Sequence, residues 1–441
     1  MSHIDPHVPS REEVLSTASA PISRSLELAS WVLAAIGLLV FIVGLFVAPD
    51  RAWRAWHFNW LYFTSIASAG VMFVAVQRIT TARWSRPIIR LLEGFVAFLP
   101  VAWILLAITL LVGKGSVFPW THEAPSVPEK QLYLDHGFVV LRDLVGFGIL
   151  VALSVWYIWT SVRLDVGHAP ESGATWARGF RERMRRGFRE ERREIHSTHS
   201  LQGKLAVVLA LVFGLGWSML AFDLSMALDM HFQSTLYGWW FFMTGWLGAI
   251  MMFSLLTMWW RRELRAYDMI TETHFHDLGK LGFAFTAFWG YLTFSQYLVI
   301  WYGNFAEETH FMRLRFIPPW KWLTFALIFM NFLIPFLGLV SRAAKVYLPT
   351  FVAFATISLV GTWIQRYLEV YPSLYGVADH LPFGLWEIGL GLFYLGVFGS
   401  TYFLFMNAFP RMRVTLMTSP FRDEVQVPVD PETMEPLPAH E

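Results

Sequence analysis

The feature that most constrains the fold is a series of ten long apolar segments. Each has about 20 mostly apolar residues, which is the length that an α-helix needs to cross a lipid bilayer. The sequence therefore predicts an all-α polytopic membrane protein with about ten transmembrane helices. The expected spans are 26–48, 58–77, 88–112, 137–161, 203–224, 236–258, 280–303, 320–341, 346–368 and 383–407.

The composition agrees with lipid as the main solvent. Only 15% of the 441 residues are charged, whereas soluble domains carry about 25%. The chain has 22 Trp residues, and many lie at the ends of apolar runs, as they do in the aromatic belts of membrane interfaces. We expect such interfacial positions for Trp53, Trp56, Trp60, Trp120, Trp259, Trp260, Trp301 and Trp320.

Several kinds of chemistry are excluded by residues that the sequence lacks. There is no Cys, which excludes disulfides and Cys-ligated iron–sulfur clusters. None of the 14 His residues lies in the middle of an expected span, so a haem inside the helical bundle would lack axial ligands. We therefore expect no cofactor bound covalently or through metal ligands. No Gly-rich phosphate loop precedes a helix, which argues against a nucleotide-driven pump, and we expect no nucleic-acid partner.

Basic residues predict the orientation of the chain. With the N-terminus inside, about 25 of the 34 Lys and Arg residues fall in cytoplasmic segments, as the positive-inside rule requires. Both termini are then cytoplasmic, and the polar N-terminus does not resemble a cleaved signal peptide. The expected organisation is an N-terminal segment 1–25, helices over 26–161, a basic cytoplasmic loop 162–202, helices over 203–408 and a C-terminal tail 409–441.

The basic loop and the tail have distinct compositions. In the loop, Arg alternates with Glu from Arg181 to Glu194, which favours an amphipathic helix on anionic lipid headgroups. A docking site for a partner subunit is the alternative. The tail after Pro420 is rich in Pro and Glu, and we expect it to be extended.

Ionisable residues near the outer ends of the spans are candidates for chemistry, since such groups are costly in a membrane. Asp143 lies about two turns inside the fourth span, and His136 falls on nearly the same stripe. Glu387 is expected about two turns inside the tenth span. Asp223 lies near the end of the fifth span, with His231 in the following loop. A deep carboxyl without a partner holds or passes protons, so we expect all five residues to handle protons.

Ion pairing is the alternative role for these charged residues. Arg142 with Asp135, and Arg366 with Glu369, have spacings that suit structural ion pairs at the interface. Either Arg could also pair with Asp143 or Glu387. A carboxylate locked in this way would support assembly rather than proton exchange.

Two stretches resemble a known family. Residues 275–280 read Phe-His-Asp-Leu-Gly-Lys, and residues 294–298 read Phe-Ser-Gln-Tyr-Leu, followed by Ile300, Trp301 and Tyr302. Upstream, residues 228–235 read Leu-Asp-Met-His-Phe-Gln-Ser-Thr, after Phe-Asp at 222–223. These runs resemble the F subunit of bacterial alternative complex III. Four positions depart from the family pattern, namely Leu224, Met230, Phe232 and Gln233.

The resemblance implies a polysulfide-reductase-like (NrfD-like) fold of two four-helix bundles plus two flanking helices, in the bacterial inner membrane. It implies a second NrfD-like membrane subunit, iron–sulfur and c-type haem subunits on the outer side, and a terminal oxidase as partners, besides membrane lipids. The expected role is quinol interaction or proton translocation without a redox centre of its own. Independently of the resemblance, the polar residues Tyr291, Gln296 and Tyr297 of the seventh span are candidate quinone contacts, although hydrogen bonding between helices is the favoured role for such residues.

Two other functions remain open. A secondary transporter would place its substrate site near the bilayer midplane, often at helices broken by Gly or Pro. The midplane positions here are mostly Phe, Leu, Val and Ala, which favours the quinol interpretation. A purely structural scaffold is the third possibility, and it requires that every buried acid can be replaced without effect.

Overall fold

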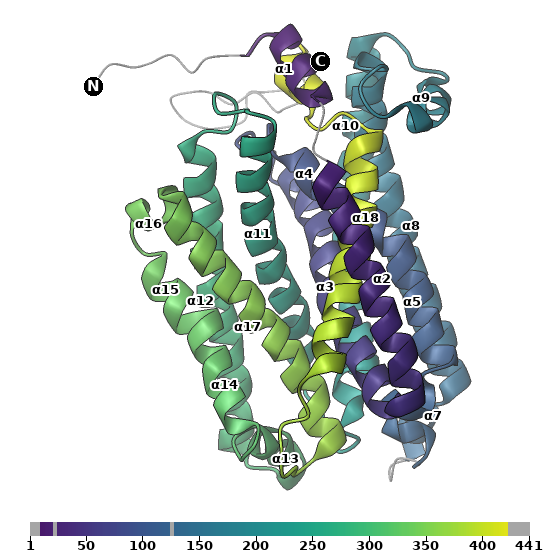
Figure 1. Cartoon of the computed structure of the whole chain (residues 1–441), viewed down its shortest axis with the longest axis vertical. Helices are drawn as coiled ribbons and strands as arrows, with labels where there is room; N and C mark the ends of the chain where they lie inside the picture. Colours follow the sequence, from purple (N-terminus) through teal and green to yellow (C-terminus); the bar gives the residue numbers. More distant parts are fainter. Residues whose placement is uncertain (1–8, 21–23, 124–127, 422–441) are drawn as a thin grey trace, which may run out of the picture.

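The computed structural model describes residues 9–20, 24–123 and 128–421, which are predominantly helical and contain no strand (Figure 1). Within those residues, nine segments are long and apolar enough to cross a membrane. The predicted all-α polytopic membrane architecture is therefore confirmed. The nine are α2 (Arg24–Val47), α3 (Pro49–Ile79), α4 to α5 (Ile89–Leu111), α8 (His136–His168), α10 (Glu191–Leu224), α11 (Tyr237–Glu263), α14 to α15 (Lys321–Gly338), α17 (Leu348–Tyr375) and α18 (Leu385–Ala408).

The remaining expected span, 280–303, corresponds to α12 (Glu272–Gly303). This helix has 32 residues and packs beside α11 and α15. Its sequence is less apolar than the other nine because aromatic and polar residues such as Ser295 and Gln296 replace aliphatic ones. α12 nevertheless runs the length of the bundle (Figure 1).

The long helices form two groups of four and one pair. In the first group, α3 and α8 each pack against both α5 (Leu99–Leu111) and α10. In the second, α11 packs against α12 and α17, and the interrupted helix α14 to α15 packs against α17. α2 and α18 pair with each other and lie against α3. This grouping is the one that the family resemblance implies.

Short helices cover the two ends of the bundle (Figure 1). α1 (Arg11–Ser19) and α9 (Arg178–Arg185) lie at one end, which we call the α9 end, and α19 (Val414–Thr418) packs against α1 there. α7 (Pro128–Tyr133) and α13 (Ala306–Arg315) lie at the opposite end, which we call the α13 end. The other short helices are α4 (Ile89–Glu93), α6 (Lys114–Val117) and α16 (Arg342–Val346).

Most of the Trp residues expected at the interface are in the core. α3 begins at Pro49, nine residues before the expected span, and its added turns bury Trp53 and Trp56 against Phe41. Trp301 is exposed, as expected. A large ring at the end of an apolar run can pack between helices as readily as it can face headgroups. Trp53, Trp56, Trp60, Trp120, Trp260 and Trp320 are buried among the helices, and their depth in the membrane stays a prediction.

The basic loop is shorter than expected because α10 already begins at Glu191. Within the loop, α9 is a separate helix with an exposed Trp176 beside it. Arg181 of α9 is buried and donates hydrogen bonds of 2.9 Å to the carbonyl oxygens of Ala174 and Ala408. The loop is thus fastened to the bundle itself. The tail expected to be extended lies outside the described residues from 422 onward.

Two helices of the second group differ from the expected spans in ways that shape a cavity. α17 continues to Tyr375, beyond the expected end at residue 368, so Glu369 lies inside it as Arg366 does. The helix expected over 320–341 is interrupted by a π-helical turn, Phe329–Leu333. Such turns are rare and frequently occur at functional sites.

Candidate functional site

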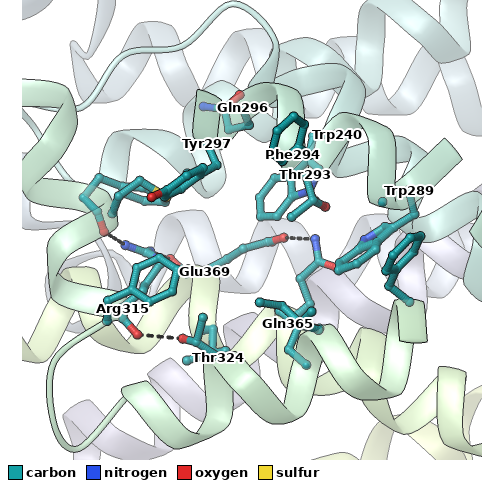
Figure 2. Close-up of a pocket in the computed structure, with 18 of the residues that line it drawn as sticks. Trp240, Trp289, Thr293, Phe294, Gln296, Tyr297, Arg315, Thr324, Gln365 and Glu369 are labelled. Carbon is teal, nitrogen blue, oxygen red and sulfur yellow. Dashed lines mark hydrogen bonds between the residues drawn. The ribbon is translucent and has the colours of Figure 1, made fainter. Parts of the chain in front are cut away.

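A cavity of about 480 Å³ lies between α11, α12, α13, α14 and α17 (Figure 2). Its walls are mainly apolar, with a few polar groups that converge on it, as in typical small-molecule sites. The polar lining consists of Tyr237, Trp240, Trp289, Thr293, Gln296, Tyr297, Arg315, Thr324, Gln365 and Glu369.

Glu369 supplies a buried carboxylate to the cavity wall. Its oxygen atoms accept hydrogen bonds of 2.9 and 2.7 Å from Nη1 of Arg366, one turn earlier on α17. The Arg366 guanidinium lies 3.4 Å above the ring of Phe241 and donates to the Phe241 carbonyl oxygen at 2.8 Å. The predicted Arg366–Glu369 ion pair is therefore confirmed, and it belongs to the cavity.

Gln365 connects this carboxylate to three other helices. Its amide nitrogen donates to Glu369 at 3.0 Å and to the Thr244 hydroxyl at 2.9 Å. Its amide oxygen accepts from the Trp289 indole at 2.8 Å and from Asn331 at 3.5 Å. Asn331 is the buried residue of the π-helical turn. Five polar groups from four helices thus hold the carboxylate in one position.

Arg315, at the end of α13, brings a positive charge to the same wall. Its guanidinium donates to the carbonyl oxygens of Phe311 at 2.7 Å and Glu369 at 3.2 Å, and to the Ser373 hydroxyl at 3.1 Å. Burial lowers the pKa of Arg315 to about 10, against the opposing effects of Tyr237, Asp229 and Glu369. A pKa of about 10 leaves Arg315 charged at neutral pH.

Gln296 and Tyr297 of α12 face Arg315 and Glu369 across the cavity (Figure 2). The Gln296 side chain also exchanges hydrogen bonds of 2.9 and 2.8 Å with the Ser234 hydroxyl. Two of the three candidate contacts on α12 therefore line the cavity. Tyr291 does not, because its side chain is 64% exposed on the outer face of the helix.

Gln296 also lines a second hollow, an open groove of about 860 Å³ at the α13 end. Its lining includes charged residues, with Glu129 and Lys130 of α7 on one side and Glu308 of α13 on the other. Burial lowers the pKa of Lys130, partly offset by the charges of Asp229 and Glu307. Gln296 and Ser234 therefore stand between the cavity and the groove.

Asp143 and Asp223 are brought together beside this groove. Both are buried and lie close enough for their charges to interact, and neither oxygen atom of Asp143 has a hydrogen-bond partner among the described residues. Arg142 bonds to Asp223 at 2.7 and 2.8 Å, not to Asp135, which caps α8 through the backbone N–H of Phe138. The expected Arg142–Asp135 pair is thus wrong. Because ionised carboxylates only accept hydrogen bonds, contact between the two acids is favourable when they share one proton.

Glu387 does not have the environment expected of a deep, unpartnered acid. α18 begins at Leu385, so Glu387 is in its first turn, and it pairs with Arg51 at 2.7 Å. It also accepts from the Tyr371 hydroxyl at 2.8 Å and from the backbone N–H of Gly384 at 2.7 Å. The carboxylate is buried but fully partnered, which is the structural alternative, with Arg51 rather than Arg366 as its partner.

The two candidate histidines lie apart from these acids. His231 is exposed in the loop after α10, where its backbone N–H donates to Asp229 at 3.2 Å. His136 is the first residue of α8 and lies near Trp120. No interaction among the described residues joins either histidine to Asp143 or Asp223.

Sequence reasoning missed the part of the cavity that comes from α13 and the π-helical turn. Arg315 falls in a connection between spans, where basic residues are common and do not indicate a functional site. Asn331 is a single polar residue within an apolar run, which was a usable signal.

The arrangement suits an amphipathic molecule with a compact polar head. Glu369 can accept a proton or a hydrogen bond, and Arg315 can stabilise a negative charge. Among the described residues there is no cluster of three or more metal-ligating side chains. Comparison of the sequence with protein-family models and with curated proteins gives no match.

Proposed function

We propose that the chain is an integral membrane subunit of a quinol-oxidising respiratory complex related to alternative complex III, and that quinol binds in the cavity. The observation that carries the proposal is the pair of charged groups, Glu369 and Arg315, on one wall of a largely apolar cavity of about 480 Å³. A quinol has two hydroxyl groups at opposite ends of a flat ring, and an apolar tail. It therefore needs polar groups on two sides of an apolar slot.

The polar groups are placed for the proton chemistry of quinol oxidation, which releases two protons and two electrons. The Glu369 carboxylate accepts the proton of the nearer hydroxyl, as a general base. Gln296 and Tyr297 hydrogen-bond the farther oxygen, and Arg315 stabilises the negative charge that develops as protons leave. The electrons pass to an iron–sulfur cluster of a partner subunit.

Protons leave through the groove at the α13 end. Gln296 and Ser234 connect the cavity with this groove, whose carboxylates Glu129 and Glu308 accept protons from it. Tyr133 lines the groove, and the guanidinium of Arg142, which pairs with Asp223, lies 4.0 Å from the centre of the Tyr133 ring. The Asp143–Asp223 pair therefore lies next to the same path. The pair stores one proton between turnovers.

The proposed setting is the bacterial inner membrane. The Arg-rich loop around α9 supports a cytoplasmic location for the α9 end by the positive-inside rule, and both termini are proposed to lie on the same side. The α13 end then faces outward, where iron–sulfur and c-type haem subunits dock. A second NrfD-like subunit lies beside the chain in the membrane, and a terminal oxidase receives the electrons.

Secondary transport of a small amphipathic compound is the second candidate. The π-helical turn Phe329–Leu333, followed by Pro335, favours it because transporters build substrate sites at interrupted helices. Purification separates the two functions. Co-purifying red-brown subunits with haem and iron–sulfur clusters support the quinol function, whereas a colourless protein that moves a compound across proteoliposomes supports transport.

The decisive variant is Glu369→Gln in the intact complex. It keeps the size of the side chain and one acceptor oxygen, but it removes the proton acceptor and the counter-charge of the buried Arg366. In complex that has assembled, kcat/KM for quinol should fall at least about 100-fold. Glu307→Gln, an exposed acid on the same helix as Arg315, is the control and should retain normal turnover. Wild-type turnover by an assembled Glu369→Gln complex would refute quinol oxidation in this cavity.

A further inference from the structure

A smaller cavity of about 70 Å³ lies at the α9 end, between the ends of α3, α8 and α10. Its lining includes three Arg residues and several neutral polar residues, but no Asp or Glu. The charged and polar side chains of the lining include those of Arg78, Arg86, Arg413, Gln77, Ser85 and Gln202. The cavity is unrelated to the quinol site, which faces the opposite end.

Arg78 is the least compensated of these cations. One terminal nitrogen, Nη2, donates to the carbonyl oxygen of His199 at 3.0 Å, and Nε is buried without a hydrogen-bond partner. The described residues place no carboxylate in salt-bridge contact with Arg78. Gly203 makes room for the guanidinium, since a Cβ there would lie 3.1 Å from Nη2. A partly buried charge with so few partners is costly unless a ligand supplies the rest.

The nearest carboxylates are already neutralised by other cations. Arg413 bonds to Glu93 at 3.1 Å and approaches Asp165 at 3.6 Å. Arg90 bonds to the same two acids. Two acids and two bases therefore balance beside the cavity, and the charge of Arg78 is additional to them.

We infer that this cavity binds an oxyanion of the phosphate class, either the headgroup of an anionic phospholipid or free phosphate. Guanidinium groups suit phosphate oxygens in charge and geometry. The Ser85 hydroxyl donates to the Gln77 amide oxygen at 2.9 Å, which leaves the Gln77 NH₂ group as a further donor. Val74 and Leu164 form apolar walls beside these donors. Basic pockets between helices at the cytoplasmic face commonly bind anionic lipid headgroups.

The test compares lipid retention by purified full-length chains. Native mass spectrometry in a neutral detergent should show one phosphatidylglycerol bound per wild-type chain, in preference to phosphatidylcholine. Arg78→Gln should weaken this binding about tenfold, as the loss of a charged hydrogen bond predicts. Arg83→Gln removes an equal charge from an exposed position in the same connection and should leave binding unchanged.

A second arm identifies the source of the anion. If inorganic phosphate, and not chloride at equal ionic strength, displaces the lipid or raises the melting temperature of delipidated wild-type chain, free phosphate is a ligand. If it does neither while phosphatidylglycerol binds, the ligand is the lipid. Should Arg78→Gln fail to fold, Arg86→Gln takes its place. The inference is overturned if neither probe binds wild type, or if the Arg83 control loses as much binding as the cavity variants.

Discussion

Arg51 and Glu387 join the first turns of α3 and α18 through two hydrogen bonds of 2.7 and 2.8 Å. Glu387 is fully buried, whereas the Arg51 side chain keeps 30% of its exposure. The bond links two helices that are far apart in the sequence. Its role is therefore expected to be in assembly.

We expect Glu387→Gln to destabilise the protein by about 1–3 kcal/mol, because it leaves Arg51 without its counter-charge. This loss of stability is smaller than that expected for a fully buried ion pair, because water still reaches Arg51. Thermal unfolding in detergent measures the loss, and Arg51→Met combined with Glu387→Gln should recover part of it. Quinol turnover per assembled complex should be normal. Slowed quinol turnover with unchanged stability would contradict this structural role and would indicate that Glu387 transfers protons.

Asp143→Asn tests whether the two facing acids store a proton. Asn imitates the protonated acid and can donate to Asp223, so the variant should assemble and unfold as wild type does. It cannot release a proton, and we expect slower quinol oxidation with an altered dependence on pH. The matched variant Asp223→Asn removes the partner of Arg142 and should lower stability as well. Wild-type turnover across the pH range by Asp143→Asn would assign both acids a structural role.

The contact between α2 and α18 depends on small residues. A Cβ on Gly396 would lie 2.2 Å from the backbone nitrogen of Ala34, which cannot move without separating the helices. Gly396→Ala should therefore destabilise the protein by about 1–3 kcal/mol. Gly214→Ala on α10 meets nothing within 4 Å and should be neutral or slightly stabilising. Equal melting temperatures for the two variants would contradict this packing.

Reporter fusions test the orientation. Fusions at both termini and within 178–193 should report the cytoplasm, because the α9 end carries the Arg-rich loop and because α1 and α19, the first and last described helices, pack together there. A fusion in the α6 to α7 connection, at the opposite end, should report the outside. A periplasmic signal from any of the first three sites would reverse the proposed topology.

The sequence predicted the helices well because each span satisfies a local requirement, a run of apolar residues of sufficient length. It predicted their ends poorly where charged or aromatic residues continue a helix, as Pro49 to Trp56 and Glu369 to Tyr375 do. The partners of the charged residues were harder to predict from the sequence than the ends of the helices. The Arg366–Glu369 pair was predictable because it lies within one turn, whereas Arg51 and Glu387 are 336 residues apart.

The cavity was the least predictable feature. Its polar groups come from separate helices and from α13, and only folding brings Arg315, Thr293 and Glu369 together. Gln296 and Tyr297 were recognised as polar residues of one span, which carried no information about the opposite wall of the cavity. Tyr291 lies on the same helix but on its exposed face, so it does not reach the cavity. The sequence of one helix did not indicate which of its faces would line the cavity.

The pairing of α2 with α18 also has a consequence for biosynthesis. The two helices are the first and the last long apolar segments of the described chain, and they are joined by a hydrogen bond of 2.9 Å from Asn407 to Glu27, 380 residues earlier. At ordinary rates of translation, α2 waits about 20 to 75 s for its partner. During that time its small-residue face meets lipid or the insertion machinery. A ribosome that stalls before α18 therefore leaves a membrane protein in which α2 lacks its packing partner. Quality-control proteases of the membrane can recognise such an unpaired helix.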